Sequence, residues 1–153
     1  MPPVLPIWPR VLFGVIEPVL LLSGAYAAFT NPQEFANKQV PGTPATIPTS
    51  ANSTITVLQT GNIYLLLAGL AILCCFFSSP QVARNYLLVV ACADLGHIYA
   101  TYAGLGGNMF FDVANWNDMV WGHVGTSSFL FVNRVATAAG IFGSSEKGGT
   151  KRE

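Results

Sequence analysis

Charged residues are scarce in this chain of 153 residues, at 9%, whereas hydrophobic residues make up 52%. A soluble domain carries about 25% charged residues, so the deficit is too large for a protein whose whole surface faces water. The formal net charge is zero, and a chain without a basic excess lacks the electrostatic footprint of a nucleic-acid-binding protein. We therefore expect a single domain embedded in a lipid bilayer.

Cysteine is also scarce, with three residues, Cys74, Cys75 and Cys92, all within apolar runs. An odd number of cysteines outside polar loops argues against a disulfide framework. A structural zinc site needs closely spaced Cys and His ligands, which this spacing does not offer. The cysteines are predicted to be buried reduced thiols, and no metal or cofactor is expected.

What the sequence does contain is long apolar stretches. A membrane-spanning helix needs about 20 mostly apolar residues, and four stretches qualify, at about residues 11–29, 55–77, 85–105 and 120–142. They predict an all-α fold, a membrane four-helix bundle within a domain of residues 1–143. An alternative is that the first stretch is a cleaved signal peptide ending near Ala25-Tyr26-Ala27, but Glu17-Pro18 interrupts its apolar region.

Two polar segments lie outside these stretches. Residues 31–54 are rich in Pro, Thr and Asn and predict an irregular loop, and this loop carries a glycosylation sequon at Asn52. Residues 144–153 predict a disordered tail. Arg10, Arg84 and the basic residues of the tail fall on one side of a four-helix topology, and only Lys38 falls on the other. The positive-inside rule then predicts cytosolic termini and a lumenal loop, in a protein of the endoplasmic reticulum.

Three ionisable residues fall inside the predicted helices, at similar depth. At a rise of about 1.5 Å per residue, Glu17, Asp94 and Arg134 lie roughly 10 to 13 Å from the cytosolic ends of their helices. Charged side chains within a membrane face a bundle interior, find partners there and often mark a functional site. We expect these three side chains to form one layer.

The third apolar stretch adds an imidazole, His97, about one helical turn above this layer. Asp94 and His97 are three residues apart, which puts them on one helix face, and a carboxylate beside an imidazole can orient it. In the first stretch, Pro18 follows Glu17 and removes a backbone donor. The carbonyl group left free, near Gly14, can accept a hydrogen bond from water or a side chain in the same cavity.

This cluster has a structural and a functional interpretation. Polar side chains hydrogen-bond membrane helices together, so Arg134 paired with Glu17 or Asp94 could be only a buried ion pair. One arginine neutralises one carboxylate, however, and a second carboxyl group that keeps its proton is a usable general acid. We therefore favour a functional site. The polar and aromatic residues nearby are substrate-binding candidates: Tyr64, Asn62, Asn133, Trp121, His123 and Tyr99.

These residues resemble a family of small fungal four-helix membrane proteins. The motifs that carry the resemblance are Glu17-Pro18, Asn62-Ile63-Tyr64, Asp94-Leu95-Gly96-His97 and an arginine, Arg134, after an aromatic-rich stretch. The similarity extends over about residues 7–142 except the loop. Within that family, the chain is similar to membrane epoxide hydrolases and cyclases of polyene polyketide pathways, such as those making aurovertin and citreoviridin.

The resemblance implies a secondary-metabolite enzyme that opens epoxides of an oxidised polyene, with water or an internal hydroxyl as nucleophile. Asp94, working with His97, would be the base and Glu17 the protonated acid, or the two roles could be reversed. Arg134 would keep Asp94 ionised, and Tyr64 would be a secondary donor. The hydrophobic substrate is expected to enter from the bilayer between helices.

Two other functions remain open from the sequence. Sterol isomerases and terpene or meroterpenoid cyclases also use intramembrane carboxylates, so the substrate could be prenylated. Alternatively, the protein could be a non-catalytic membrane scaffold or a lipid-binding accessory subunit. The sequence does not decide between a single chain and a homo-oligomer.

Overall fold

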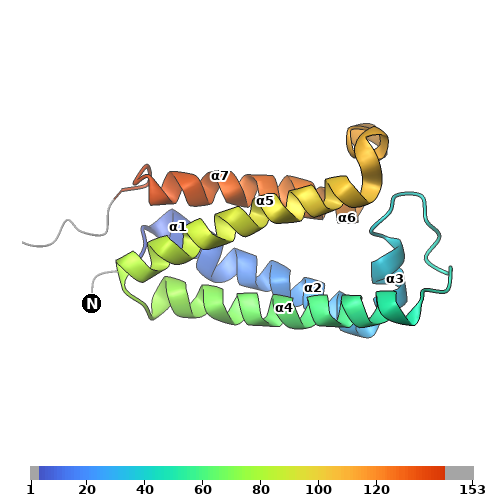
Figure 1. Ribbon diagram of the computed structural model, residues 1–153. Coiled ribbons are helices and arrows are strands. Elements are labelled where there is room, and N and C mark those ends of the chain that lie inside the picture. Colours follow the sequence, from blue (N-terminus) through green and yellow to red (C-terminus); the bar gives the residue numbers. More distant parts are fainter. Residues whose placement is uncertain (1–3, 144–153) are drawn as a thin grey trace, which may run out of the picture.

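The computed structural model describes residues 4–143, and within them the fold is built from helices without strands (Figure 1). The predicted disordered tail, residues 144–153, lies outside the described residues. In chain order the elements are α1 (Ile7–Val11), the π-helical turn η1 (Leu12–Ile16), α2 (Glu17–Thr30), α3 (Pro32–Asn37), α4 (Ala51–Phe76), α5 (Pro80–Phe110), the 3₁₀ turn η2 (Val113–Asn115), α6 (Asp118–Val120), the π-helical turn η3 (Trp121–Thr126) and α7 (Ser127–Ala138).

The predicted all-α four-helix bundle is confirmed, although its helix bounds differ from the apolar stretches. Helices α4 and α5 begin earlier than predicted because polar caps precede the apolar residues: the side chains of Ser50 and Ser79 accept hydrogen bonds from the backbone N–H groups of Ser53 and Val82. At the C-terminal end, α7 stops at Ala138 rather than near residue 142, and Gly140 follows it with a positive φ of 78°.

The segment 31–54, predicted as an irregular loop, contains a helix. α3 has Pro32 at its first position, where a missing N–H does no harm. Its last residue, Asn37, is buried and donates hydrogen bonds to the carbonyl oxygens of Ala45 and Ile47, at 3.2 and 2.8 Å. These bonds fold the rest of the segment back onto α3.

The helices pack as two pairs, α2 along α4 and α5 along α7 (Figure 1). Glycine allows the first pair to approach closely, since a Cβ on Gly61 would lie 3.1 Å from the Cβ of Ala28. In Figure 1 the pair α5 and α7 diverges from α2 and α4 toward the end of the molecule that carries α3 and α6. The divergence leaves room between the pairs for the cavities described below.

The outer surface of the bundle is apolar. Among residues 4–143, three helical stretches, Ile7–Thr30, Ala51–Phe76 and Pro80–Phe110, are long and apolar enough to cross a membrane, and the predicted fourth span, residues 120–142, is not among them. Most of their large aliphatic side chains point outward, with Leu66 at 61% and Val89 at 70% exposure. Leaving such a side chain in water costs about 1.5–3 kcal/mol, which is avoided when the surroundings are lipid. The organelle and the orientation of the termini stay predictions.

The three cysteines are free thiols, as expected. Their predicted burial is correct only for Cys75, which packs in a core with Phe13 and Leu87. Cys74 is half-buried and Cys92 is exposed on the apolar surface, because a helix in a bundle buries only one of its faces.

Candidate functional site

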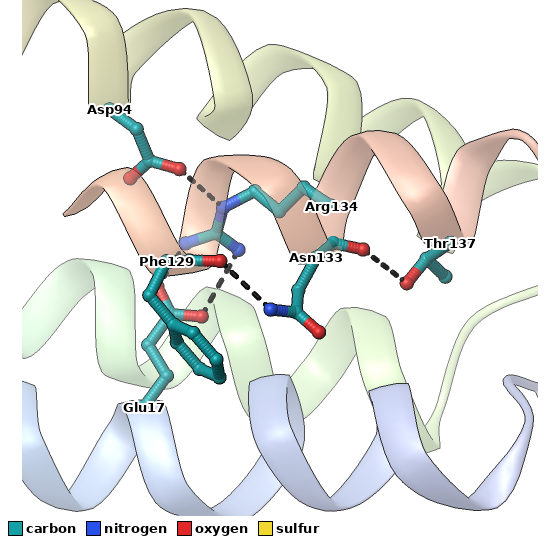
Figure 2. Close-up of polar contacts among 6 residues, drawn as sticks. All are labelled: Glu17, Asp94, Phe129, Asn133, Arg134 and Thr137. Atoms are coloured by element: carbon teal, nitrogen blue, oxygen red, sulfur yellow. Dashed lines mark hydrogen bonds and ion pairs between the residues drawn. The ribbon is translucent and has the colours of Figure 1, made fainter. Parts of the chain in front are cut away.

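Arg134 joins the two helix pairs through both buried carboxylates (Figure 2). Its side chain, on α7, is completely buried. Its Nε donates to Oδ2 of Asp94 on α5 at 2.8 Å, and its two terminal nitrogens donate to the two oxygens of Glu17 on α2, with Nη1 at 3.1 Å from Oε2. The structure thus brings together the three residues that the sequence placed at one depth.

The expected pairing of one arginine with one carboxylate is wrong, because Arg134 binds both. If all three groups are ionised, the cluster carries one net negative charge, which is unfavourable in a buried, apolar setting. The two carboxylates also differ in their hydrogen bonds. Glu17 is held through both oxygens, in the bidentate geometry that makes such pairs strong. Asp94 is held through Oδ2 alone, and no described residue donates a hydrogen bond to its Oδ1.

The ring of Phe13 supports the guanidinium from one side. The Cζ atom of Arg134 lies 4.8 Å from the centroid of this fully buried ring, a distance at which a cation is attracted to an aromatic face. Phe13 and the two carboxylates therefore fix Arg134 in one position.

A cavity of about 340 Å³ adjoins this cluster. Glu17, Asp94, His97 and His123 line it, and the rest of the wall is mostly apolar but also includes Asp118. We call it the acidic cavity. A water molecule occupies about 30 Å³, so the cavity has room for on the order of ten waters. A mostly apolar wall with a few polar groups is typical of small-molecule sites.

The two histidines meet inside the bundle. The rings of His97 on α5 and His123 on η3 pack edge to face, with centroids 4.6 Å apart and an angle of 75° between planes. We expected Asp94 to orient His97 directly. Among the hydrogen bonds of the described residues, however, none joins these two side chains. His97 is instead oriented by the ring of His123, which the sequence had placed near a membrane border.

Two π-helical turns position residues of the acidic cavity. Pro18 has no N–H to donate to the carbonyl of Gly14, and the chain widens into η1 directly before Glu17. The second turn, η3, contains His123. Such turns rotate the following side chains relative to a regular helix and occur frequently at functional sites.

Among the substrate-binding candidates, Tyr64 and His123 line the acidic cavity. The ring of Tyr64 lies directly over Gly24, where a Cβ would come within 3.0 Å of it. Asn62 is exposed, and so is Tyr99, at 68%. These two residues point away from the bundle interior and do not line the acidic cavity, and their role in substrate binding stays a prediction.

Asn133 and Trp121 also lie outside the acidic cavity. Asn133 accepts a hydrogen bond from the indole nitrogen of Trp8 at 3.0 Å, which ties α7 to α1. Trp121 is half exposed and packs edge to face against Trp116, with ring centroids 5.0 Å apart. Both residues have structural contacts instead of the predicted substrate contacts. Asn52 is exposed in the first turn of α4, and its glycosylation stays a prediction.

Ser127 is buried and lines the acidic cavity, although it was not among the predicted site residues. A signal was available, because His123, Ser127, Leu130 and Arg134 follow one another at spacings of four, three and four residues. That spacing places all four on one helix face. Among the residues that the structure describes, no group of three or more His, Cys, Asp or Glu side chains could hold a metal ion.

Comparison with known proteins places the chain in a family without assigning an activity. A family model described as a domain of unknown function, DUF7704, matches residues 3–144, which is nearly the whole chain. No curated protein and no solved structure matches it.

Proposed function

The chain belongs to the DUF7704 family, and we propose that it is a membrane-embedded enzyme that opens epoxides of a hydrophobic substrate by acid–base catalysis. One observation carries the proposal: Glu17 and Asp94, both bonded to the buried Arg134, line an apolar cavity inside a bundle with an apolar exterior. A carboxyl pair of this kind would be an unfavourable way to hold helices together, because a buried ion pair is often less stabilising than apolar packing.

Epoxide opening needs a proton donor for the leaving oxygen and a base for the nucleophile. The hydrogen bonds support the assignment with Asp94 as the acid. Both oxygens of Glu17 are engaged by Arg134, which favours a fixed carboxylate, whereas Oδ1 of Asp94 is free to carry a proton. Asp94 gives this proton to the epoxide oxygen as its C–O bond breaks. The nucleophile forms the new C–O bond and loses its own proton to a base in the cavity.

The base in this scheme needs a lone pair that points into the cavity. Glu17 is a poor choice because Arg134 already binds both of its oxygens. His97 lines the same cavity and shares a helix face with Asp94. We therefore assign the role of base to His97. Glu17 instead holds Arg134 in position.

A route from the lipid supports a hydrophobic substrate. Leu20 lines the acidic cavity and is also 48% exposed on the apolar surface of α2. We therefore place the entrance to the cavity beside this side chain. A substrate dissolved in the bilayer can enter there without crossing water, as the proposed polyene epoxide would require.

The proposal is tested with the purified protein in lipid nanodiscs, supplied with lipophilic polyene epoxides in H₂¹⁸O. We expect a diol carrying one ¹⁸O atom, or an isomeric cyclic ether without ¹⁸O if an internal hydroxyl attacks. A carbocycle formed from a prenyl epoxide would instead favour a cyclase. Failure of a folded, monodisperse protein to consume any of these epoxides would contradict the proposal.

A further inference from the structure

A second cavity, of about 550 Å³, lies beside the acidic cavity. It is formed between α3, the first turns of α4 and the later turns of α5, at the end of the molecule where the helix pairs diverge (Figure 1). The described residues that line it include no Asp, Glu, Lys or Arg. Its polar lining consists of hydroxyl, amide and imidazole groups, among them Gln39, Asn52, Ser53, Thr56, Thr60 and Thr101. We call it the hydroxyl-rich cavity, and its lining is suited to water.

Four side chains line both cavities and so form the wall between them: Phe35, Tyr64, His97 and His123. Phe35 offers only an apolar ring. The two imidazoles can each accept a proton at one ring nitrogen and donate one at the other. They are the two histidines of the whole chain, and in this wall they are in contact.

We propose that water from the hydroxyl-rich cavity passes the His97–His123 pair into the acidic cavity, where His97 takes its proton. This inference rests on the proposed function and supplies its nucleophile. Water from the hydroxyl-rich cavity attacks the epoxide carbon, and His97 takes its proton as the new C–O bond forms. His97 then returns that proton to Asp94, which gave its own proton to the epoxide oxygen. The products are a diol and an enzyme in its starting state.

The surroundings of the pair are consistent with this cycle. Besides the two histidines, the titratable groups that line the acidic cavity are Glu17 from α2, Tyr64 from α4, Asp94 from α5 and Asp118 from α6. Asp94 is the one that shares a helix face with His97, and one bridging water is enough to carry the proton between them. His123 acts through His97, because its ring edge fixes the plane of the His97 imidazole, and is therefore a positioning residue.

The first test needs no turnover. Diethyl pyrocarbonate modifies accessible neutral imidazoles, and with two histidines in the chain each modified peptide identifies its residue. We expect both to react in the folded protein in nanodiscs. Thr60→Phe, which fills the hydroxyl-rich cavity, should slow the reaction several-fold, whereas Thr60→Val, which removes the hydroxyl at similar volume, should not. Thr56→Leu provides a second filling variant if Thr60→Phe does not fold.

An unreactive His97 in the folded wild-type protein, or equal reactivity in folded filling variants, would overturn the inference. Either result would leave the proposed function standing. If both histidines react as expected but no epoxide is consumed, the proposed function fails and the water path remains.

The second test is catalytic. His97→Ala should lower kcat about 100-fold, the lower range for a general base, and added imidazole should restore part of the activity. His123→Ala should lower kcat at unchanged KM, and His123→Phe, which keeps an aromatic edge, should restore it. A His97→Ala variant that turns over like the wild type, or a folded one that imidazole does not rescue, would overturn the role of His97 as the base for the incoming water.

Discussion

Arg134 donates hydrogen bonds to both carboxylate oxygens of Glu17, a residue 117 positions earlier in the chain. The contact links the pair α5 and α7 to the pair α2 and α4, and both side chains are buried. Because Arg134 also binds Asp94, one side chain holds three helices together. The stability and the proposed chemistry of the protein therefore depend on the same residue.

Replacing Arg134 should destabilise the fold strongly. Arg134→Ala leaves two carboxyl groups buried without a cation, and breaking such a pair costs about 3–5 kcal/mol. Thermal or denaturant unfolding of the protein in detergent measures this loss. Arg84→Ala is the matched control, since Arg84 is exposed and donates one hydrogen bond to the carbonyl of Ala138, worth about 1 kcal/mol. Equal effects of the two substitutions would contradict the central role of Arg134.

The charge balance of Glu17, Asp94 and Arg134 predicts that amide substitutions of the two carboxyl groups have non-additive effects on stability. Glu17→Gln or Asp94→Asn each leaves one carboxylate to balance the charge of Arg134, so the cluster stays neutral. Each single variant should therefore lose less stability than Arg134→Ala. The double variant leaves Arg134 buried without an anion and should lose more than the sum of the two singles. Additive losses, measured by the same unfolding assay, would show that the three charges are not coupled.

Access from the bilayer can be tested at Leu20. Leu20→Trp should narrow the opening of the acidic cavity and lower kcat/KM for long lipophilic epoxides more than for short ones. Leu22→Trp is the control, because Leu22 is similarly exposed, at 47%, but does not line the cavity. The same loss in both variants would mean that the substrate does not enter beside Leu20.

Because η1 packs closely against α4, alanine substitutions at two glycines should differ in their effect on stability. A Cβ on Gly14 would lie 2.5 Å from a ring carbon of Phe76, whereas one on Gly69 would meet nothing within 4 Å. Gly14→Ala should therefore destabilise the protein by about 1–3 kcal/mol. Gly69→Ala should be neutral or slightly stabilising, because alanine has the higher helix propensity. A neutral Gly14→Ala would show that η1 can move away from Phe76 freely.

Much of the fold and part of the candidate site could be predicted from the sequence. The four main helical segments follow from the apolar stretches, and the layer of Glu17, Asp94 and Arg134 follows from the rise per residue. Depth does not give the rotation of a helix about its axis, however. Tyr99 lies two residues after His97 and Trp121 two before His123, and residues so spaced do not face the same side of a helix. Both were placed too close to the site for this reason.

The contact between His97 and His123 could not be predicted either. It depends on the π-helical turn η3, and no residue pattern within that turn indicates the wider winding. The shared use of Arg134 by two carboxylates depends on the separation of three helices, which their individual sequences do not encode. The capped start of α4 and the helix α3 were missed because apolar runs alone defined the predicted helices.

The most direct test of the proposed chemistry is the turnover of a lipophilic epoxide by Asp94→Asn in nanodiscs. Asparagine keeps the shape of the side chain and leaves the Arg134–Glu17 pair intact, but it cannot donate the proton of a carboxyl group. We predict that kcat falls at least about 100-fold, as for loss of a general acid, while the unfolding midpoint stays close to that of the wild type. Diol formation within a few-fold of the wild-type rate would contradict the account.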